Sequence, residues 1–278
     1  DYIIDEQDGI KDPLGMSGVR LEAKVHIITG SVTAAQNIVK CCNRTGLNVA
    51  EIVLAPLAAA EAVLSDEERE LGVMLVDMGG GTTDIAVYHD GTLKHTAVLG
   101  IGGNHVTNDI AAGLRTPFND AERIKRRYGF AKARMATAEE RVEVPSVGGK
   151  GAGTVSRQIL CEIIEPRLDE IFELIQREVA KSGYEGSLAS GVVITGGSML
   201  LPGAVEVAER TFGLPVRLGV PAHVGGLVDV IDSPAYSAGV GLVLHGMKRQ
   251  ERAVFRPRDD KILTKVKHRM SDWLSDFF

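Results

Sequence analysis

Runs of consecutive apolar residues predict the strands at the centre of this protein. Residues 72–76 and 192–195 are apolar nearly throughout, which is typical of strands that are buried on both faces. Further strands are predicted at residues 21–28, 52–54, 85–88, 92–99, 141–147 and 216–218. Residues 89–91, between two of these stretches, predict a hairpin turn.

Apolar residues spaced three and four apart predict the helices. The longest such pattern covers residues 156–179 and places a kink at Pro166. Other helices are predicted at residues 33–43, 58–64, 106–112, 120–128 and 235–244. The glycine-rich run 148–153 predicts a loop, and the polar residues 247–260 predict a linker.

Composition narrows the class of protein. The chain has 278 residues, 44% hydrophobic and 24% charged, which excludes disordered and fibrous proteins and leaves room for roughly two domains. A net charge of −6 argues against a nucleic-acid partner. Cys41, Cys42 and Cys161 have no metal-ligand spacing, so neither a disulfide framework nor a zinc site is expected. Because the sequence starts at Asp1 without a targeting segment, we expect a cytosolic fragment whose N-terminal part is missing.

A glycine-rich turn after the first buried strand is the main candidate for chemistry. Residues 77–84 read Asp-Met-Gly-Gly-Gly-Thr-Thr-Asp. Glycines let the backbone approach an anion closely and present N–H groups to phosphate oxygens, and threonine hydroxyls add donors. Asp77 is placed to hold Mg²⁺ through water. The candidate phosphate ligands are Gly79, Gly80, Gly81, Thr82 and Thr83. The alternative is a hairpin turn without a ligand.

The region 76–87 resembles the second phosphate loop of the actin/Hsp70/sugar-kinase ATPase superfamily. Residues 193–198 resemble its adenosine loop, with Gly196, Gly197 and Ser198 as contacts. Glu122 and Lys125 resemble the acid and lysine that hold the adenosine, although a plain surface ion pair is the alternative. The resemblance implies an α/β, actin-like (RNase H-like) ATPase fold of mixed sheets flanked by helices, with ATP and Mg²⁺ as cofactors.

Further motifs, at residues 15–20, 100–110, 143–149 and 165–167, resemble the FtsA family of bacterial cell-division proteins. This implies a protein that anchors the FtsZ division ring to the cytoplasmic face of the cell membrane at the division site. The implied partners are the FtsZ C-terminal peptide, further copies of the chain, the lipid surface and other divisome proteins. The family's first phosphate loop has no counterpart here, so an incomplete first domain is expected.

The same resemblance implies a division of the chain into subdomains. We expect a remnant of the family-specific small subdomain at 1–30, part of the first ATPase subdomain at 31–71, the second ATPase subdomain at 72–115 and 168–246, a nucleotide-side and partner-binding subdomain at 116–167, a linker at 247–260 and a membrane-targeting helix at 261–278.

One departure from the superfamily concerns hydrolysis. Chaperone and rod-type relatives carry an acidic residue before the Pro-x-Ala-Ala-Ala helix to position the attacking water, and the matching residue here is Ala55. Alanine cannot orient or deprotonate water. Glu61 lies about one and a half turns into the helix and would point elsewhere. We therefore expect the full-length protein to bind ATP with slow or negligible hydrolysis, and we assign no catalytic residue. Because half of the cleft is missing from this chain, we expect the chain itself to bind ATP weakly or not at all.

Residues 261–278 predict an amphipathic helix suited to a lipid headgroup layer. Lys265 and Arg269 lie on its cationic side. Its apolar face carries Ile262, Leu263, Val266, Met270, Trp273, Leu274, Phe277 and Phe278. One such helix is a weak anchor, whereas a row of them on a polymer would bind strongly. The alternative is a terminal helix that docks on the protein's own core.

Three other functions share the fold. An Hsp70-like ATPase would need a peptide-binding region after the core, where this chain has the amphipathic segment. A small-molecule kinase would need a catalytic acid in the N-terminal domain. An actin-like pilus-assembly protein would not be expected to carry this tail.

Overall fold

The computed structural model describes all residues except 1, 11, 147–152, 223, 226–227 and 255–278. The strands are β1 (Tyr2–Ile4), β2 (Gln7–Ile10), β3 (Leu21–Ala23), β4 (Val73–Met78), β5 (Thr83–His89), β6 (Thr92–Leu99), β7 (Arg141–Val144), β8 (Gly153–Ser156), β9 (Val192–Thr195) and β10 (Val216–Leu218). The α-helices are α1 (Val32–Arg44), α2 (Ala55–Val63), α3 (Asp66–Leu71), α4 (Gly103–Leu114), α5 (Phe118–Tyr128), α6 (Arg157–Ser182), α7 (Ala204–Phe212), α8 (Val228–Ile231) and α9 (Ser237–Val254). Short 3₁₀ turns are η1 (Ala133–Met135), η2 (Glu185–Ser187), η3 (Gly197–Leu200) and η4 (Pro234–Tyr236).

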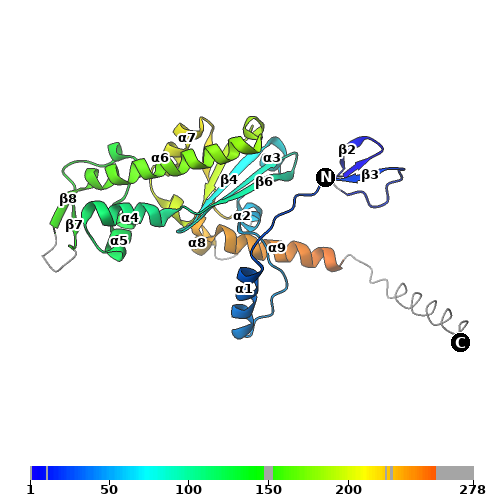
Figure 1. Ribbon diagram of the computed structural model, residues 1–278, viewed down its shortest axis with the longest axis horizontal. Helices are drawn as coiled ribbons and strands as arrows, with labels where there is room; N and C mark the ends of the chain where they lie inside the picture. The colour runs from blue at the N-terminus through cyan, green and yellow to red at the C-terminus, as the bar shows by residue number, and fades with distance from the viewer. Residues whose placement is uncertain (1, 11, 147–152, 223, 226–227, 255–278) are drawn as a thin grey trace, which may run out of the picture. The chain divides into compact units, whose positions relative to one another are not determined.

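A five-stranded mixed sheet, in the order β10-β9-β4-β5-β6, carries the fold (Figure 1). β4 pairs antiparallel with β5, and β5 pairs antiparallel with β6. β4, β9 and β10 run parallel, with Asp77 opposite Thr195 in the register. The carboxyl ends of β4 and β9 therefore meet at one edge of the sheet, which is where ligands bind in open sheets of this kind.

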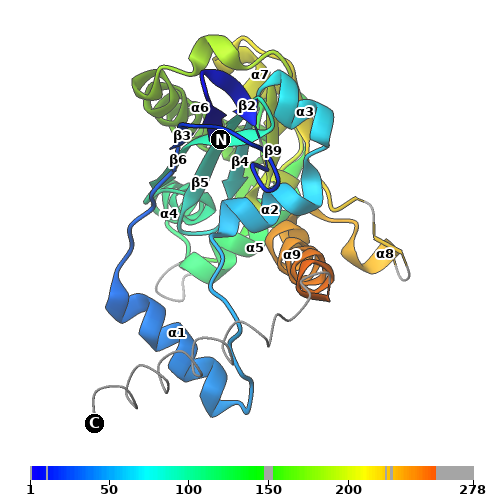
Figure 2. The ribbon, with the colours of Figure 1, turned by 90° about the vertical axis from the view of Figure 1, so that its right-hand side faces the viewer.

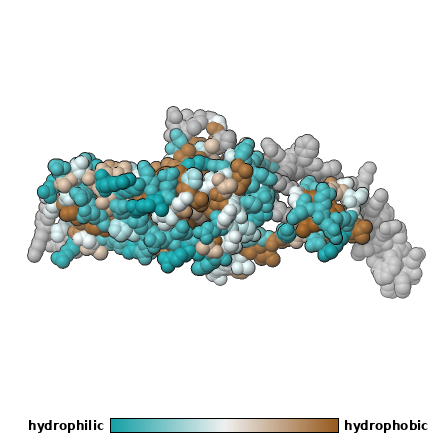
Figure 3. Space-filling view, turned by 90° about the horizontal axis from the view of Figure 1, so that it is seen from above, coloured by the Kyte–Doolittle hydropathy of each residue, from teal (hydrophilic) through white to brown (hydrophobic). Residues whose placement is uncertain are grey.

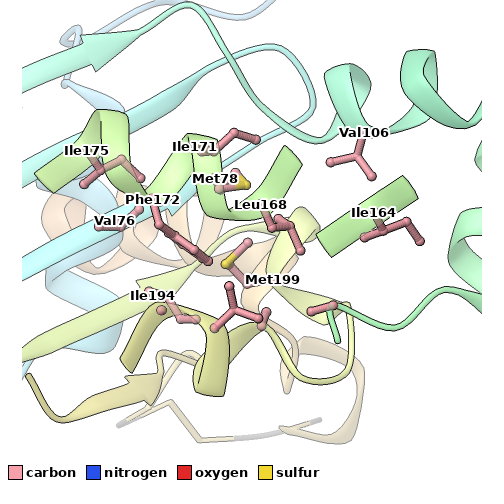
Figure 4. Packing of buried hydrophobic residues seen from close by; sticks show 14 of the residues in the cluster. Val76, Met78, Val106, Ile164, Leu168, Ile171, Phe172, Ile175, Ile194 and Met199 are labelled. Atoms are coloured by element: carbon pink, nitrogen blue, oxygen red, sulfur yellow. The ribbon is translucent and has the colours of Figure 1, made fainter. Parts of the chain in front are cut away.

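Helices cover both faces of this sheet. α6 and α7 lie over one face, and α2 contacts β4 and β5 on the other (Figure 2). Figure 4 shows Ile171 and Phe172 of α6 beside Val76 and Met78 of β4 and Ile194 of β9, all fully buried. Burial of such side chains contributes about 1.5–3 kcal/mol each to the stability of the fold. The packing of α6 on β4 and β9 therefore fixes the position of the carboxyl ends of these strands. The face in Figure 3 is mainly hydrophilic with scattered apolar patches.

Several predicted elements differ from the structure. Residues 52–54 are not a strand, and the predicted strand 21–28 ends at Ala23. The helix α9 continues to Val254, so the linker predicted from residue 247 is wrong for its first half. This stretch carries no glycine or proline before Pro257 that would end a helix. α6 continues without interruption through Pro166 and across the expected boundary at 167/168.

α1 forms where the pattern predicts, yet none of its residues is buried. Apolar residues such as Val32 and Ile38 are 70% and 58% exposed there. Contacts between Cα atoms divide the chain into two units at Leu242/Val243, and the described part of the second unit, up to Val254, is helix. Among the described residues, every helix is too short or too polar to traverse a lipid bilayer. The membrane-targeting helix predicted at 261–278 lies outside the described residues.

Candidate functional site

The glycine-rich turn joins β4 to β5 as an exposed loop. Gly79 N–H donates to the Thr82 carbonyl at 2.9 Å and closes the turn. Gly80 and Gly81 are exposed, and within the described part of the chain their N–H groups have no hydrogen-bond acceptor. Unbonded backbone N–H groups in a tight turn form a concavity that attracts anions. The loop is therefore available to phosphate oxygens.

The first turn of α4 is bound directly to this loop. Gly103 N–H donates to the Gly79 carbonyl at 3.0 Å, and Asn104 N–H donates to the Gly80 carbonyl at 2.7 Å. A Cβ atom at Gly102 would lie 2.7 Å from the Gly79 carbonyl oxygen, closer than packed atoms allow. Glycine at this position lets the two segments approach.

The segment after β9 forms the second wall of the site. Ser198 donates its hydroxyl proton to the Gly79 carbonyl at 2.8 Å, across 119 positions of sequence. Gly196 has a φ of +94°, and a Cβ atom there would lie 2.4 Å from the Met78 carbonyl oxygen and 2.5 Å from Asp77 Oδ1. Only glycine fits this approach. The Gly196-Gly197-Ser198 turn is thus fixed against the end of β4.

α5 supplies the third wall, beside α4 (Figure 1). Lys125 Nζ lies 2.7 Å from Glu122 Oε2, so the two side chains share one helix face as predicted. The same ammonium donates to the Gly103 carbonyl at 2.9 Å and to Thr107 Oγ1 at 2.8 Å. Burial alone would raise the pKa of Glu122, but hydrogen bonds from Lys125 and Thr107 and nearby positive charges lower it below its ordinary value. Glu122 is therefore ionised at neutral pH.

These three walls enclose a cavity of about 440 Å³, a volume typical of small-molecule sites. Six predicted contacts line it: Gly79, Gly80, Glu122, Lys125, Gly197 and Ser198. The sequence analysis did not name the other lining residues as contacts, although Gly103, Asn104 and Pro202 lie in motifs that carry the resemblance. These residues are Gly103, Asn104, Arg126, Leu200, Leu201, Pro202 and Ala235. The position of Arg126 directly after Lys125 and the glycines at 100–103 were available signals. The cavity thus has a polar floor and an apolar side.

Asp77 lies at the end of β4, directly opposite Asp84 in the β4–β5 register. Burial, with repulsion from Asp84, raises the pKa of Asp77 to about 6, and burial also raises the pKa of Asp84. Within the described residues no salt bridge joins this pair of like charges to a cationic side chain, and such a pair fits a bound cation. No group of three metal-binding side chains occurs in the described part of the chain, so a cation here would keep several waters.

The remaining predicted contacts have other surroundings. Thr83 is fully buried, and its hydroxyl donates a hydrogen bond to the Ile101 carbonyl at 2.7 Å. This bond fixes the buried end of the loop to the segment before α4. Gly81 and Thr82 are exposed in the loop itself. On α2, Ala55 is exposed, and Glu61 lies 3.5 Å from Arg69. Among the described residues, Glu122 is the only carboxylate that lines the cavity.

The predicted membrane contacts all fall at 262–278, outside the described residues. The structure therefore leaves the amphipathic segment as a prediction from the sequence.

Comparison with known families gives two matches along the chain. The family model for "Cell division protein FtsA" matches residues 74–241. A second model, "SHS2 domain inserted in FTSA", matches residues 1–29.

Named relatives match at high identity. The Cell division protein FtsA of Pseudomonas aeruginosa is 56% identical over 250 residues, which cover 90% of this chain and 60% of that protein. The protein of the same name from Neisseria meningitidis is 44% identical over 284 residues and covers all of this chain and 68% of the relative. In Escherichia coli the identity is 47% over 253 residues, with 88% and 60% covered. The chain thus spans between 60% and 68% of these relatives.

Solved structures share the fold at low identity. MreB5 of Spiroplasma citri bound to ADP matches with a TM-score of 0.64 and 16% identity, covering 81% of this chain and 68% of that one. The PilM-PilN type IV pilus biogenesis complex matches with a TM-score of 0.57 and 18% identity, covering 77% and 57%. These likenesses confirm the actin-like α/β fold, a mixed sheet flanked by helices.

Proposed function

The chain belongs to the FtsA family of bacterial cell-division proteins, and we propose that it binds ATP with Mg²⁺ between the β4–β5 loop, α4, α5 and the turn after β9. The match to cell-division proteins over most of the chain favours this function over a chaperone-like ATPase, a kinase or a pilus-assembly protein. MreB5, which shares the fold, is described as bound to ADP and, in a second structure, to AMPPNP.

The observation that carries the proposal is that motifs far apart in sequence line one cavity. Gly80, Glu122 and Ser198 come from three separate segments, and all line the same 440 Å³ space. Two of these segments are hydrogen-bonded to each other through the Gly79 carbonyl. A surface ion pair or a ligand-free hairpin would not require this convergence.

Each part of the cavity suits one part of the nucleotide. Gly80 lines the cavity, and its N–H group suits phosphate oxygens. Gly81, next to it in the same exposed loop, lies outside the cavity lining. The ionised Glu122 carboxylate accepts hydrogen bonds and suits ribose hydroxyls. Leu201 and Pro202 offer apolar contact to the base. Mg²⁺ held near Asp77 would neutralise phosphate charge, and the Asp77 carboxylate would orient the waters bound to the ion.

We propose that hydrolysis is slow. Ala55 begins α2 and carries no group that could orient water. Glu61 pairs with Arg69 of α3, so it does not replace the missing acid. A steady-state rate of roughly 1 s⁻¹ or above would contradict this.

At the level of the whole protein, we propose that this family member ties the FtsZ ring to the cytoplasmic face of the membrane. The amphipathic segment 261–278 would contact lipid, the region 116–167 would bind the FtsZ C-terminal peptide, and self-association would gather many tails on one polymer. Other divisome proteins would bind the assembled polymer. Nucleotide would act as a ligand that biases self-association.

Calorimetric titration with Mg²⁺·ATP tests the nucleotide site. The chain should show saturable binding, Glu122→Ala should weaken it, and Arg123→Ala should not. Arg123 is a suitable control because it lies on the same helix, pairs with Asp120 and does not line the cavity. Absence of saturable binding, or equal affinity in the Glu122 variant, would refute the site.

Sedimentation with anionic vesicles tests the anchor. The intact chain should pellet with vesicles, and a chain ending at residue 260 should stay in solution. Trp273→Glu, on the apolar face, should abolish pelleting, whereas Ser275→Glu, outside that face, should weaken it far less. FtsZ should pellet with the loaded vesicles, and FtsZ without its C-terminal peptide should not. Pelleting that survives deletion of the tail would overturn the proposal.

A further inference from the structure

We propose that Thr107 is the positioning residue of the adenosine side of this site and that it acts by orienting the Glu122 carboxylate. This inference rests on the proposed nucleotide site and assigns roles within it. Thr107 lies one turn into α4, within the motif at residues 100–110, but it was not among the candidate ligands. Its side chain is fully buried beneath the cavity.

The hydrogen bonds of Lys125 carry the first half of the argument. An ammonium group has three N–H donors and no acceptor. Here Lys125 Nζ has three acceptors within the protein, which are the Gly103 carbonyl at 2.9 Å, Thr107 Oγ1 at 2.8 Å and Glu122 Oε2 at 2.7 Å. The ammonium therefore links α5 to the first turn of α4. In that turn the N–H groups of Gly103 and Asn104 donate to the carbonyls of Gly79 and Gly80 in the phosphate loop.

The surroundings of Glu122 carry the second half. Its Oε2 receives both Lys125 and the Thr107 hydroxyl, the latter at 2.5 Å. The Thr107 hydroxyl accepts a hydrogen bond from Lys125 and has one proton to donate. Besides Glu122 Oε2, the acceptor within reach of that proton is the Gly103 carbonyl at 3.1 Å. Within the described residues, Oε1 of Glu122 has no hydrogen-bond donor, and Glu122 lines the cavity. Two fixed donors on one oxygen therefore orient the other oxygen toward the ligand.

A residue that acts by orienting Glu122 should affect recognition of the ribose more than recognition of the phosphates. Thr107→Val keeps the shape of the side chain and removes the hydroxyl. Thr107→Ser keeps the hydroxyl, and Thr107→Ala is a second variant without it should the valine impair folding. The readout is the ratio of dissociation constants for 2′-deoxy-ATP and ATP, together with that for 3′-deoxy-ATP.

Wild type should prefer ATP to at least one deoxynucleotide. Thr107→Val should weaken ATP binding about tenfold, as expected for a hydrogen bond to a charged group, and should reduce that preference, while Thr107→Ser keeps both. In a Glu122→Ala background, Thr107→Val should change the preference no further, because its effect passes through Glu122. Equal weakening of ATP and both deoxynucleotides by Thr107→Val would overturn the positioning role.

A second measurement does not depend on nucleotide. NMR titration of the Glu122 carboxyl should show a higher pKa in Thr107→Val than in wild type, and a value close to wild type in Thr107→Ser. An unchanged pKa in Thr107→Val would refute the positioning role even if ATP binds. A raised pKa in a chain that binds no ATP would keep the role of Thr107 and refute the proposed nucleotide site.

Discussion

Replacing Asp77 by asparagine should stabilise the fold while removing a ligand of the cation. Asp77 faces Asp84 across two paired strands, and burial with this repulsion raises its pKa from 3.8 to about 6. Each unit of pKa corresponds to about 1.36 kcal/mol. A shift of about two units therefore costs the folded state about 3 kcal/mol when Asp77 is ionised.

The sign of the pH dependence follows from the direction of the shift. Because the folded-state pKa lies above the unfolded one, the folded state binds the proton more tightly. The stability that this site contributes is fully present below about pH 4 and is lost as the pH rises to about 6. Asp77→Asn resembles the protonated acid at every pH. It should raise the free energy of unfolding by up to about 3 kcal/mol at pH 7.5 and by almost nothing near pH 4.

Urea unfolding followed by circular dichroism at the two pH values measures this difference. Asp90→Asn is the matched control, because the Asp90 side chain is 66% exposed and pairs at the surface with His89 and Lys94, so its effect should stay within about 0.5 kcal/mol. Mg²⁺·ATP should raise the melting temperature of wild type more than that of Asp77→Asn. The reasoning is refuted if Asp77→Asn destabilises the protein at pH 7.5 or stabilises it equally at both pH values.

Three further variants test other parts of the site. Ser198→Ala removes the hydrogen bond to the Gly79 carbonyl and should weaken ATP binding about five- to tenfold in calorimetry; unchanged affinity would count against the link between the two loops. Arg126→Ala should weaken ATP binding several-fold and leave the urea midpoint unchanged, because this guanidinium lines the cavity and has no ion-pair partner among the described residues. Gly102→Ala places a Cβ atom 2.7 Å from a carbonyl oxygen and should cost about 1–3 kcal/mol by urea unfolding, whereas Gly239→Ala, in open space within α9, should gain about 0.5–1 kcal/mol.

The sequence alone predicted the elements whose signal is local. β6, β9 and β10 occupy the predicted residues. For β9 the reason is that a short, nearly unbroken apolar run is typical of a strand buried in a sheet. The candidate ligands Gly80, Glu122 and Ser198 were also recognised from short motifs, and the structure brings them to one cavity. Motifs of this kind are readable because backbone approach to an anion requires glycine at specific positions.

Elements that depend on a partner were predicted poorly. Residues 52–54 are apolar enough for a strand, but a strand forms only where a neighbouring strand satisfies its N–H and C=O groups. The end of α9 was also predicted wrongly, because the polar residues from 247 onward were taken for a linker. Polar residues that include no glycine or proline can remain helical, and α9 continues to Val254.

The same distinction holds within the site. Sequence determined which side chains carry charge and which turns admit an anion. Only the tertiary structure decided that the Thr83 hydroxyl donates to the Ile101 carbonyl. It also decided that the Lys125 ammonium donates to the Gly103 carbonyl and to Thr107 Oγ1. Those bonds join residues 18 positions or more apart in the chain. Hydrogen bonds of this range are set by how strands and helices pack, and no local pattern encodes them.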